Sequence, residues 1–219
     1  MLTLGFNFAT EDLCLAVVSG RTLRLRSVSV EKKYRGATIK AEYLPDYLDE
    51  LFRAAKINLK KISRLGIAIG PGAFTGLRLS LVTAKTLALE LRIPLVTVST
   101  LAALAAQYRA EAGGKKIRVI LNACRGEVTT ALFDQDLRRL EPDHVVKQNI
   151  LREPENFIIE NRPANALAVC ELAARTQAVF DRAQILPLTP QYSHASRVNL
   201  TAKPELQHLK IGQKVSPAP

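Results

Sequence analysis

LGIAIGPGAFTGLRLSLVTAKTLALEL, residues Leu65 to Leu91, is the stretch from which we predict the fold of the whole chain. It begins with a short apolar run, Leu65–Ile69, of the length and branching typical of a buried strand. A glycine-rich turn follows, and glycines there let the backbone turn sharply while another segment approaches closely. The residues to which we assign this structural role are Gly70, Pro71, Gly72 and Gly76. An unbroken helical pattern then runs to the end of the stretch.

The predicted helix carries apolar residues on two of its sides. At about 100° per residue, one broad arc consists of Leu77, Leu81, Ala84, Ala88 and Leu91. A second arc consists of Leu79, Val82 and Leu89, and Arg78, Lys85 and Arg92 separate it from the first on one side. A surface helix needs only one apolar stripe. We therefore expect this helix to pack on its own sheet and against a second surface, either another helix or another protein. The alternative is a helix buried in a two-layer core.

Two nucleotide-binding motifs are excluded at the turn. A Walker A loop needs Lys and then Ser or Thr after its last glycine, whereas Leu77 and Arg78 follow Gly76. A dinucleotide fingerprint needs the spacing G-x-G-x-x-G, which Gly70, Gly72 and Gly76 do not have. A bare helix N-terminus can still hold an anion, but it is a weak indication of any function.

Composition sets the broad class of the protein. With 219 residues, 47% of them hydrophobic, the chain is long enough for one large domain or two small lobes. The formal net charge of +11 favours contact with nucleic acid or an acidic partner, although the basic residues are scattered. Only 5% of residues are aromatic and Trp is absent, so we do not expect a platform for base stacking.

The cysteines and the first residues predict a cytoplasmic protein. Cys14, Cys124 and Cys170 are odd in number and far apart, which is typical of reduced thiols. The first ten residues, MLTLGFNFAT, lack the charged region of a signal peptide. No apolar run approaches the roughly 20 residues of a membrane span, so we expect no membrane contact.

Hydrophobic periodicity predicts an α/β protein whose first part is echoed by its second. The helix expected at Glu42–Lys56 has an apolar stripe that includes Leu48 and Leu51. The other predicted helices are Ser99 or Thr100 to Ala112 and Ala164–Arg175, and the predicted strands are Leu2–Phe8, Leu13–Val18, Arg21–Val30, Leu65–Ile69, Leu95–Val98, Lys116–Leu121, Glu127–Phe133, Leu137–Leu140 and Phe157–Ile159. Because three strands joined by turns begin both parts, we expect two lobes, residues 1–112 and 113–200, divided near Gly113-Gly114. From Thr201 onward the sequence has no hydrophobic periodicity, so we expect a flexible tail at 201–219.

Five motifs, in order and spacing, resemble one family. They are Asn7-Phe8-Ala9-Thr10, Gly70-Pro71-Gly72-Ala73-Phe74-Thr75-Gly76-Leu77-Arg78, Ala84-Lys85 with Leu87-Ala88-Leu89, Val98-Ser99-Thr100-Leu101 and Gly126-Glu127-Val128. The chain resembles the TsaB family, also called YeaZ, of tRNA threonylcarbamoyladenosine biosynthesis proteins. The block from Gly70 to Arg78 is highly specific, and the resemblance covers roughly residues 1–135.

The resemblance implies a two-lobed fold of the actin/Hsp70/sugar-kinase kind (ASKHA), with mixed sheets flanked by helices and a shortened second lobe. It also implies a non-catalytic, cytoplasmic partner of TsaD that works with TsaE through the complex. From the charge and the scarcity of aromatic residues we expect contact with tRNA only weakly or through the complex. We expect a homodimer when the chain is alone, because large exposed apolar patches are rarely left open. TsaD transfers threonylcarbamoyl to the adenosine beside the anticodon. TsaB-like proteins bind TsaD through helices of the first lobe, so we assign partner binding to Leu79, Val82, Leu89, Arg78, Lys85, Leu48 and Leu51.

The chain departs from the family pattern where an acid would hold a metal. Family members usually carry Asp at the positions of Asn7 and Asn122, and kinases of this fold use such acids for the metal that accompanies ATP. Asn lacks the charge that favours a hard cation. Glu127 has no nearby His or Asp in sequence, so we read it as a solvated acid rather than a general base.

The histidines give no metal motif. Catalytic TsaD-like relatives hold a metal with an H-x-x-x-H pair, whereas His144, His194 and His208 are never four residues apart. We therefore expect no metal, no cofactor and no catalytic residue. The alternative is an ATP-binding enzyme of the same fold, kinase-like or TsaD-like, and an ATP-dependent thermal shift would distinguish the two.

Overall fold

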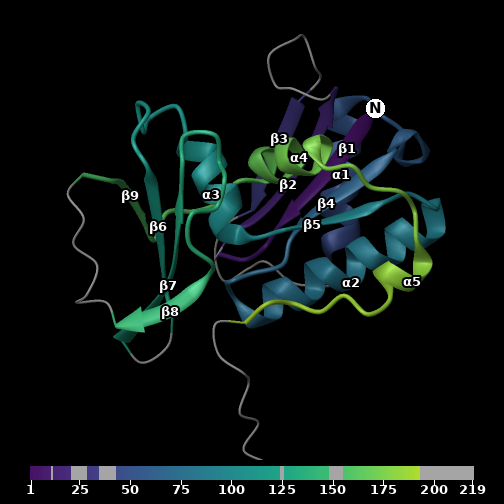
Figure 1. Ribbon diagram of the computed structural model, residues 1–219. Coiled ribbons are helices and arrows are strands. Elements are labelled where there is room, and N and C mark those ends of the chain that lie inside the picture. Colours follow the sequence, from purple (N-terminus) through teal and green to yellow (C-terminus); the bar gives the residue numbers. More distant parts are fainter. Residues whose placement is uncertain (11, 21–28, 35–42, 124–125, 148–154, 193–219) are drawn as a thin grey trace, which may run out of the picture.

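Two mixed β-sheets, each with both antiparallel and parallel strand pairs, organise the molecule (Figure 1). The structure is a computed structural model, and it describes residues 1–10, 12–20, 29–34, 43–123, 126–147 and 155–192. The predicted class, an α/β fold of two mixed sheets flanked by helices, is confirmed. Within these described ranges, no helix is both long enough and apolar enough to cross a membrane.

The first sheet contains five strands in the order β3-β2-β1-β4-β5. They are β1 (Leu2–Asn7), β2 (Leu13–Ser19), β3 (Ser29–Tyr34), β4 (Arg64–Ala68) and β5 (Leu95–Val98). The first three form an antiparallel meander, and β4 and β5 add parallel to β1. Almost every residue of β1, β2 and β4 is buried, because helices cover both faces and runs of apolar residues suit strands covered in this way.

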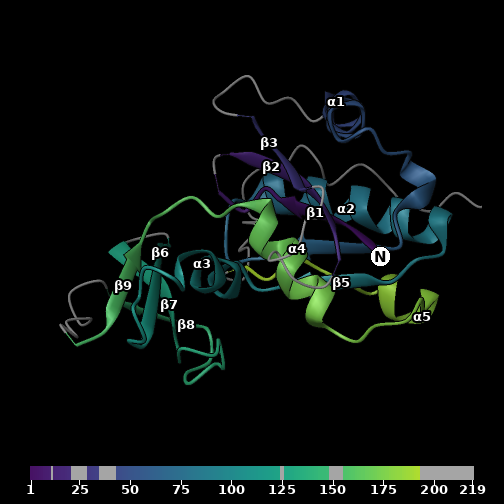
Figure 2. The same cartoon turned by 90° about the horizontal axis from the view of Figure 1, so that it is seen from above.

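Helices α1 (Leu44–Ala55) and α2 (Phe74–Leu91) cover one face of this sheet, with the short 3-10 helix η2 (Leu59–Lys61) after α1. Helix α4 (Ala166–Arg175) covers the other face, as Figure 2 shows. Pro45 lies in the first turn of α1, as predicted, where its missing N–H leaves no helical bond unmade. Cys14 and Cys170 are both buried thiols; Cys124 lies outside the described residues.

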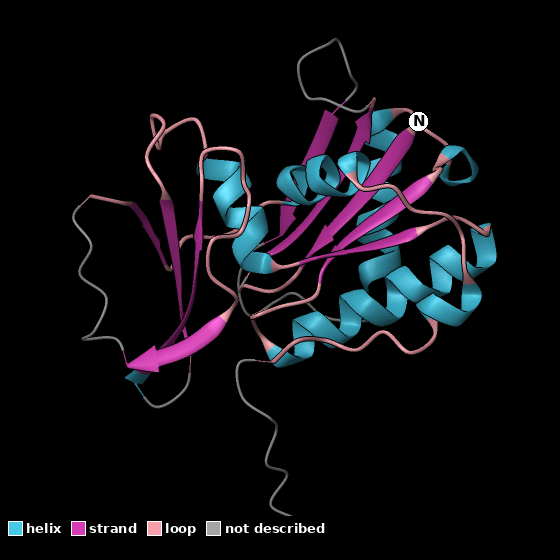
Figure 3. Cartoon of the chain, in the orientation of Figure 1, coloured by secondary structure: helices cyan, strands magenta, loops and turns pink. Residues whose placement is uncertain are grey.

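The second sheet repeats the order of connections found in the first. Its strands are β6 (Ile117–Asn122), β7 (Glu127–Phe133), β8 (His144–Lys147) and β9 (Phe157–Glu160), in the order β8-β7-β6-β9. Strands β6, β7 and β8 form an antiparallel meander, and β9 pairs parallel with β6. The second sheet therefore also opens with a three-stranded meander, but its third strand is β8 rather than the predicted Leu137–Leu140. Helix α3 (Thr100–Tyr108) lies between the sheets and packs on β6, β7 and β9 (Figure 3).

Two predicted strands are placed differently in the structure. The third strand runs past its predicted end at Val30, because β3 covers Ser29–Tyr34; residues 21–28 of the predicted strand lie outside the described residues. The strand predicted at Leu137–Leu140 is wrong, because this segment makes one bridge and β8 begins only at His144. The side chain of Asp134 accepts hydrogen bonds from the N–H groups of Asp136 and Arg138, which holds the chain in a turn.

The chain returns to the first sheet after it has completed the second. Helix α4 packs against β1, β2 and β4, and the short helix α5 (Arg182–Ile185) contacts α2. Residues 182–192, which we call the C-terminal strap, then run along α2 (Figure 1). The division into lobes at residues 1–112 and 113–200 stays a prediction, and the tail at 201–219 lies outside the described residues.

Candidate functional site

The glycine-rich turn joins the carboxyl end of β4 to α2, and two other segments of the chain lie against it. Gly70 has φ +125°, and the carbonyl of Gln191 fills the space that a Cβ would need. The N–H of Gln191 donates to the carbonyl of Ile69 at 2.7 Å. A Cβ on Gly76 would lie 2.9 Å from Cγ of Phe8. The predicted close approach at this turn is thus confirmed.

The beginning of α2 is covered by the β1–β2 turn rather than left bare. The N–H of Ala73, the residue before the helix, donates to the carbonyl of Ala9 at 2.7 Å. A Cβ on Gly72 would overlap that same residue, lying 2.7 Å from its Cβ. The protein therefore supplies its own acceptor where a helix N-terminus would otherwise attract an anion.

The two apolar arcs of α2 have different environments. Leu77, Leu81, Ala84 and Ala88 of the first arc are buried against the sheet, as predicted. Leu79 and Leu89 of the second arc are half-buried at the edge of the core. Val82 is 64% exposed, so it is the part of the second arc that presents most of its surface to a partner.

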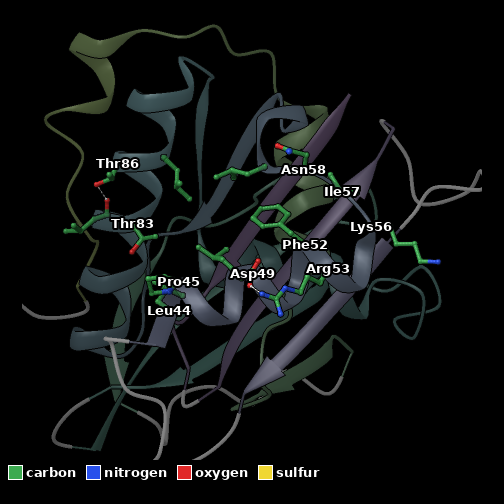
Figure 4. Close-up of a pocket in the computed structure, with 14 residues that line it drawn as sticks. Leu44, Pro45, Asp49, Phe52, Arg53, Lys56, Ile57, Asn58, Thr83 and Thr86 are labelled. Carbon is green, nitrogen blue, oxygen red and sulfur yellow. Dashed lines mark hydrogen bonds and ion pairs between the residues drawn. The ribbon is translucent and has the colours of Figure 1, made fainter.

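An open apolar groove of about 960 Å³ lies between α1 and α2. Figure 4 shows Thr83 and Thr86 of α2 on one side and Asp49 and Phe52 of α1 on the other. Its apolar lining residues are Leu44, Pro45, Leu48, Phe52, Ile57, Leu59, Val82 and Leu87. The groove exists because both helices lie on the same face of the sheet with a gap between them.

Three polar side chains on the groove walls have partners within the chain. The carboxylate of Asp49 and the guanidinium of Arg53 form an ion pair of 2.5 Å along α1. The hydroxyl of Thr86 donates to the carbonyl of Val82 at 3.0 Å. An apolar centre with a charged rim is the chemistry of a surface that binds another protein.

Arg78 and Lys85 hold the C-terminal strap. Nε of Arg78 donates to the hydroxyl of Tyr192 at 2.8 Å, and its guanidinium lies 3.7 Å from the centre of the Phe74 ring. Nζ of Lys85 donates to the carbonyls of Leu186 at 2.5 Å and Leu188 at 3.1 Å. The polar groups of both residues are thus already engaged inside the chain.

The structure therefore divides the seven residues to which we assign partner binding. Val82 and Leu48 line the groove, whereas Leu51 is completely buried in the core. Arg78 and Lys85 lie beside the strap, and Leu79 and Leu89 lie at the edge of the core. Their assignment as partner-binding residues stays a prediction. Sequence reasoning missed Phe52, Ile57, Leu59 and Leu87 of the groove lining. Phe52 lies four residues after Leu48 on α1, which is the signal that could have found it.

A second, more polar cleft of about 560 Å³ lies where the two sheets approach each other. The hydroxyl of Ser99 donates to Asp143 at 3.1 Å instead of capping α3, whose N-cap residue it is. Arg139 forms an ion pair with the same carboxylate, and a ring nitrogen of His144 lies 2.8 Å from the carbonyl of Pro142. These polar groups are therefore engaged with one another.

Asn7 and Asn122 end β1 and β6, the corresponding strands of the two sheets. The side-chain oxygen of Asn7, which is completely buried, accepts from the N–H of Ala9 at 3.1 Å. Asn122 and Asn161 are joined by two hydrogen bonds, of 2.7 and 2.9 Å. The side chains of Asn7 and Asn161 thus each hold a backbone N–H at a strand end. Over the described ranges, no three His, Cys, Asp or Glu residues are placed to hold a metal ion together.

Comparison with known proteins identifies relatives of the chain. A family model described as TsaD: tRNA N6-adenosine threonylcarbamoyltransferase matches residues 38–194. The tRNA threonylcarbamoyladenosine biosynthesis protein TsaB of Buchnera aphidicola subsp. Schizaphis graminum is 32% identical over 127 residues, 58% of each chain. TsaB of Bacillus subtilis is 41% identical over 88 residues, 39% of this chain and 38% of that protein. The matched part of the chain thus spans 58% or less of the length of these relatives.

Solved structures share the fold. YeaZ from Pseudomonas aeruginosa superposes with a TM-score of 0.70 at 21% identity, covering 85% of this chain and 98% of that one. A Pseudomonas aeruginosa protein described as similar to peptidase YEAZ gives a TM-score of 0.74 at 20% identity, covering 88% and 99%. The family model alone covers well over half of the 219 residues. The chain therefore belongs to the TsaD family, described as tRNA N6-adenosine threonylcarbamoyltransferase, and its resemblance to the TsaB/YeaZ proteins within that family is confirmed.

Proposed function

We propose that the chain is the non-catalytic, cytoplasmic partner of TsaD in the formation of N6-threonylcarbamoyladenosine in tRNA. In this role it supports the transfer of threonylcarbamoyl to the adenosine beside the anticodon, and TsaE joins through the complex. The relatives named for threonylcarbamoyladenosine biosynthesis support the pathway. The observation that carries the partner role is the open apolar groove between α1 and α2.

The groove has the shape and chemistry to receive an amphipathic helix. Its α1 wall follows a helix of 12 residues, which is about 18 Å long at 1.5 Å per residue. A partner helix would place its apolar face between Phe52 and Val82 and leave its polar face at the charged rim. Apolar openings of this kind are rarely left uncovered in soluble proteins.

A second copy of the chain fits the same groove when TsaD is absent. The acidic residues of α1 are Asp46, Asp49 and Glu50, whereas the basic residues Arg53 and Lys56 lie after them, at the end of the helix. In a two-fold dimer, α1 of one copy would run antiparallel to α1 of the other and would place acids opposite bases. This charge order supports a homodimer that TsaD replaces.

The polar clusters of the chain support a role without chemistry. Neutral amides stand at both strand ends where related kinases use acids for a metal, and the side-chain oxygen of each amide accepts a hydrogen bond within the chain. The beginning of α2 is occupied by the carbonyl of Ala9. These contacts leave the groove as the surface best suited to a function.

The substitution Val82→Glu tests the proposal. It places a carboxylate at a 64% exposed position, so we expect the isolated chain to remain folded, because a charge there is solvated. In the complex the carboxylate would be buried, which costs roughly 2–4 kcal/mol and weakens binding by a factor of about 30 or more. Size-exclusion chromatography with light scattering, a binding assay with TsaD and a reconstituted tRNA modification assay measure these effects.

The matched control is Val179→Glu. Val179 is 81% exposed and does not line the groove, so the same change there should leave dimerisation, TsaD binding and modification unaltered. A folded Val82→Glu protein that still dimerises, binds TsaD and supports modification would show that the groove is not the binding surface.

A further inference from the structure

We propose that the chain itself binds the phosphate backbone of RNA through a basic turn, defined by Lys56, Lys60 and Lys61, at the end of α1. The proposal rests on the proposed function for the identity of the RNA. It deepens that function by assigning part of the RNA contact to this chain rather than to TsaD. Its test uses the isolated chain, so its outcome is independent of whether the groove binds TsaD.

The backbone of the basic turn is held firmly. The N–H of Lys61 donates to the carbonyl of Asn58 at 2.9 Å, and the side-chain oxygen of Asn58 accepts from the N–H of Lys60 at 2.9 Å. At its two ends, the N–H of Ile57 donates to the carbonyl of Phe52 and that of Ile62 to the carbonyl of Leu59, each at 3.0 Å. A turn fixed in this way keeps the positions of its lysines constant.

Apolar and basic residues alternate along the turn, and the core takes only the apolar ones. Ile62 is buried, and Ile57 and Leu59 pack against the core of the first sheet. Lys56, Lys60 and Lys61 are all exposed. The apolar residues therefore anchor the turn while its three lysines stay exposed to solvent.

These ammonium groups have no compensating carboxylate. In the part of the chain that the structure describes, no ion pair involves Lys56, Lys60 or Lys61, and the nearby Arg53 is the residue that Asp49 neutralises. Lys115 and Lys116 form another exposed lysine pair, but there the situation differs. Glu141 lies near Lys116. The pKa of Glu141 is lowered, mainly by the hydrogen bond from Arg118 and to a smaller extent by positive charges that include Lys116. The basic turn is therefore an uncompensated positive patch.

RNA phosphate fits this patch better than a lipid surface does. Exposed lysines on a fixed turn bind phosphate oxygens as point charges, without regard to base sequence. Peripheral membrane binding needs apolar side chains that insert into the lipid, and the apolar residues of this turn pack into the core instead. An acidic protein surface remains a competitor, because Lys56 also lines the groove.

The test compares two lysine pairs that carry the same charge. The double substitution Lys60→Gln/Lys61→Gln removes two charges from the basic turn without touching a residue that lines the groove. The double substitution Lys115→Gln/Lys116→Gln removes two exposed charges from the second sheet. Each full-length variant is titrated with an unmodified tRNA transcript over a series of KCl concentrations, and circular dichroism checks that it is folded.

We expect the basic-turn variant to lose about 1.4–1.8 units from the slope of log K against log salt concentration, because each lost phosphate contact removes about 0.7–0.9. At 0.1 M salt this corresponds to binding that is about 30-fold weaker. The control pair should change the slope by less than about 0.5. This difference between the two pairs is the result that supports the proposal.

Three outcomes would overturn it. Equal losses in the two variants would mean that net charge alone attracts the RNA. Unchanged RNA binding together with weakened homodimerisation or TsaD binding would identify the turn as a protein contact. Unchanged RNA binding together with a lost affinity for vesicles of phosphatidylserine and phosphatidylcholine would identify it as a lipid contact.

Discussion

Replacing Gly76 by Ala tests how tightly the β1–β2 turn is packed against the start of α2. Gly76 is the third residue of α2, and in a helix Ala is favoured over Gly by about 1 kcal/mol. Propensity alone therefore predicts a more stable protein. The structure predicts the opposite, because the added Cβ would lie 2.9 Å from Cγ and 3.1 Å from Cδ2 of Phe8, and closer still to the carbonyl oxygen of that residue.

The size of the effect follows from which atoms have to move. The aromatic ring of Phe8 can rotate away, but its carbonyl oxygen belongs to the backbone of the β1–β2 turn, which Ala9 fastens to Ala73. Overpacking of this kind costs about 1–3 kcal/mol, occasionally more. Because a backbone atom has to move, we expect a cost in the upper part of this range, about 2–3 kcal/mol. After the gain of about 1 kcal/mol in helix propensity, Gly76→Ala should lower the free energy of unfolding by about 1–2 kcal/mol.

Urea unfolding followed by far-ultraviolet circular dichroism measures this difference. Thr75→Ala is the matched control, since it changes an exposed neighbour in the same turn of the helix and should stay within about 0.5 kcal/mol of the unmodified protein. Phe8 also packs against the core, so Phe8→Ala is destabilising by itself and its effect is read from a double-mutant cycle. Because Phe8→Ala relieves the contact with the ring, we expect Gly76→Ala to cost less in the Phe8→Ala background than in the unmodified protein. If Gly76→Ala equals or exceeds the unmodified protein in stability, the contact with Phe8 is not what requires glycine here.

Two further predictions concern single polar contacts. Arg118 is buried and donates two hydrogen bonds to Glu141, which lowers the pKa of the Glu141 carboxyl. The ionised carboxylate of Glu141 therefore stabilises the fold at pH values above its ordinary pKa of about 4.3. This stabilisation is lost as the pH falls through the lowered pKa. We expect Glu141→Gln to lower the free energy of unfolding in urea by about 1–2 kcal/mol at pH 7 and by much less at pH 3. An equal loss at both pH values would contradict this. Lys85→Met removes the two hydrogen bonds to main-chain carbonyls of the strap. Amide hydrogen exchange at residues 186–192 should therefore become faster, while the amides of β1 and β4 stay protected. Unchanged exchange at residues 186–192 would show that other contacts hold the strap.

Local patterns predicted most of the strands and the buried side of α2. The bounds of β5 and β7 match the predicted ranges Leu95–Val98 and Glu127–Phe133, because each is a short apolar or alternating run between turn residues. The segment Leu137–Leu140 was predicted wrongly, because its apolar ends suggested a strand. The side chain of Asp134 imposes a turn there instead.

The candidate site was predicted only in part, since it depends on distances between elements. The periodicity of α2 singled out Val82, but the groove has two walls, and the sheet beneath them sets how far apart they are. The partners of Arg78 and Lys85 could not be foreseen for a different reason. Lys85 binds main-chain carbonyls, which every residue possesses, and the strap that supplies them has no hydrophobic period.

The return of α4 to the first sheet determines when that sheet can be completed during synthesis. About 70 residues separate the last strand of the sheet, β5, from the first residue of the helix that covers its second face. At 5–20 residues per second, the ribosome needs roughly 4–14 s to make that interval. For this time, the nascent sheet bears an uncovered side that includes Cys14 and Ala16, the residues on which Cys170 later packs. A fragment that stops at Gly113 would keep that apolar side permanently open, and we expect it to aggregate rather than fold alone.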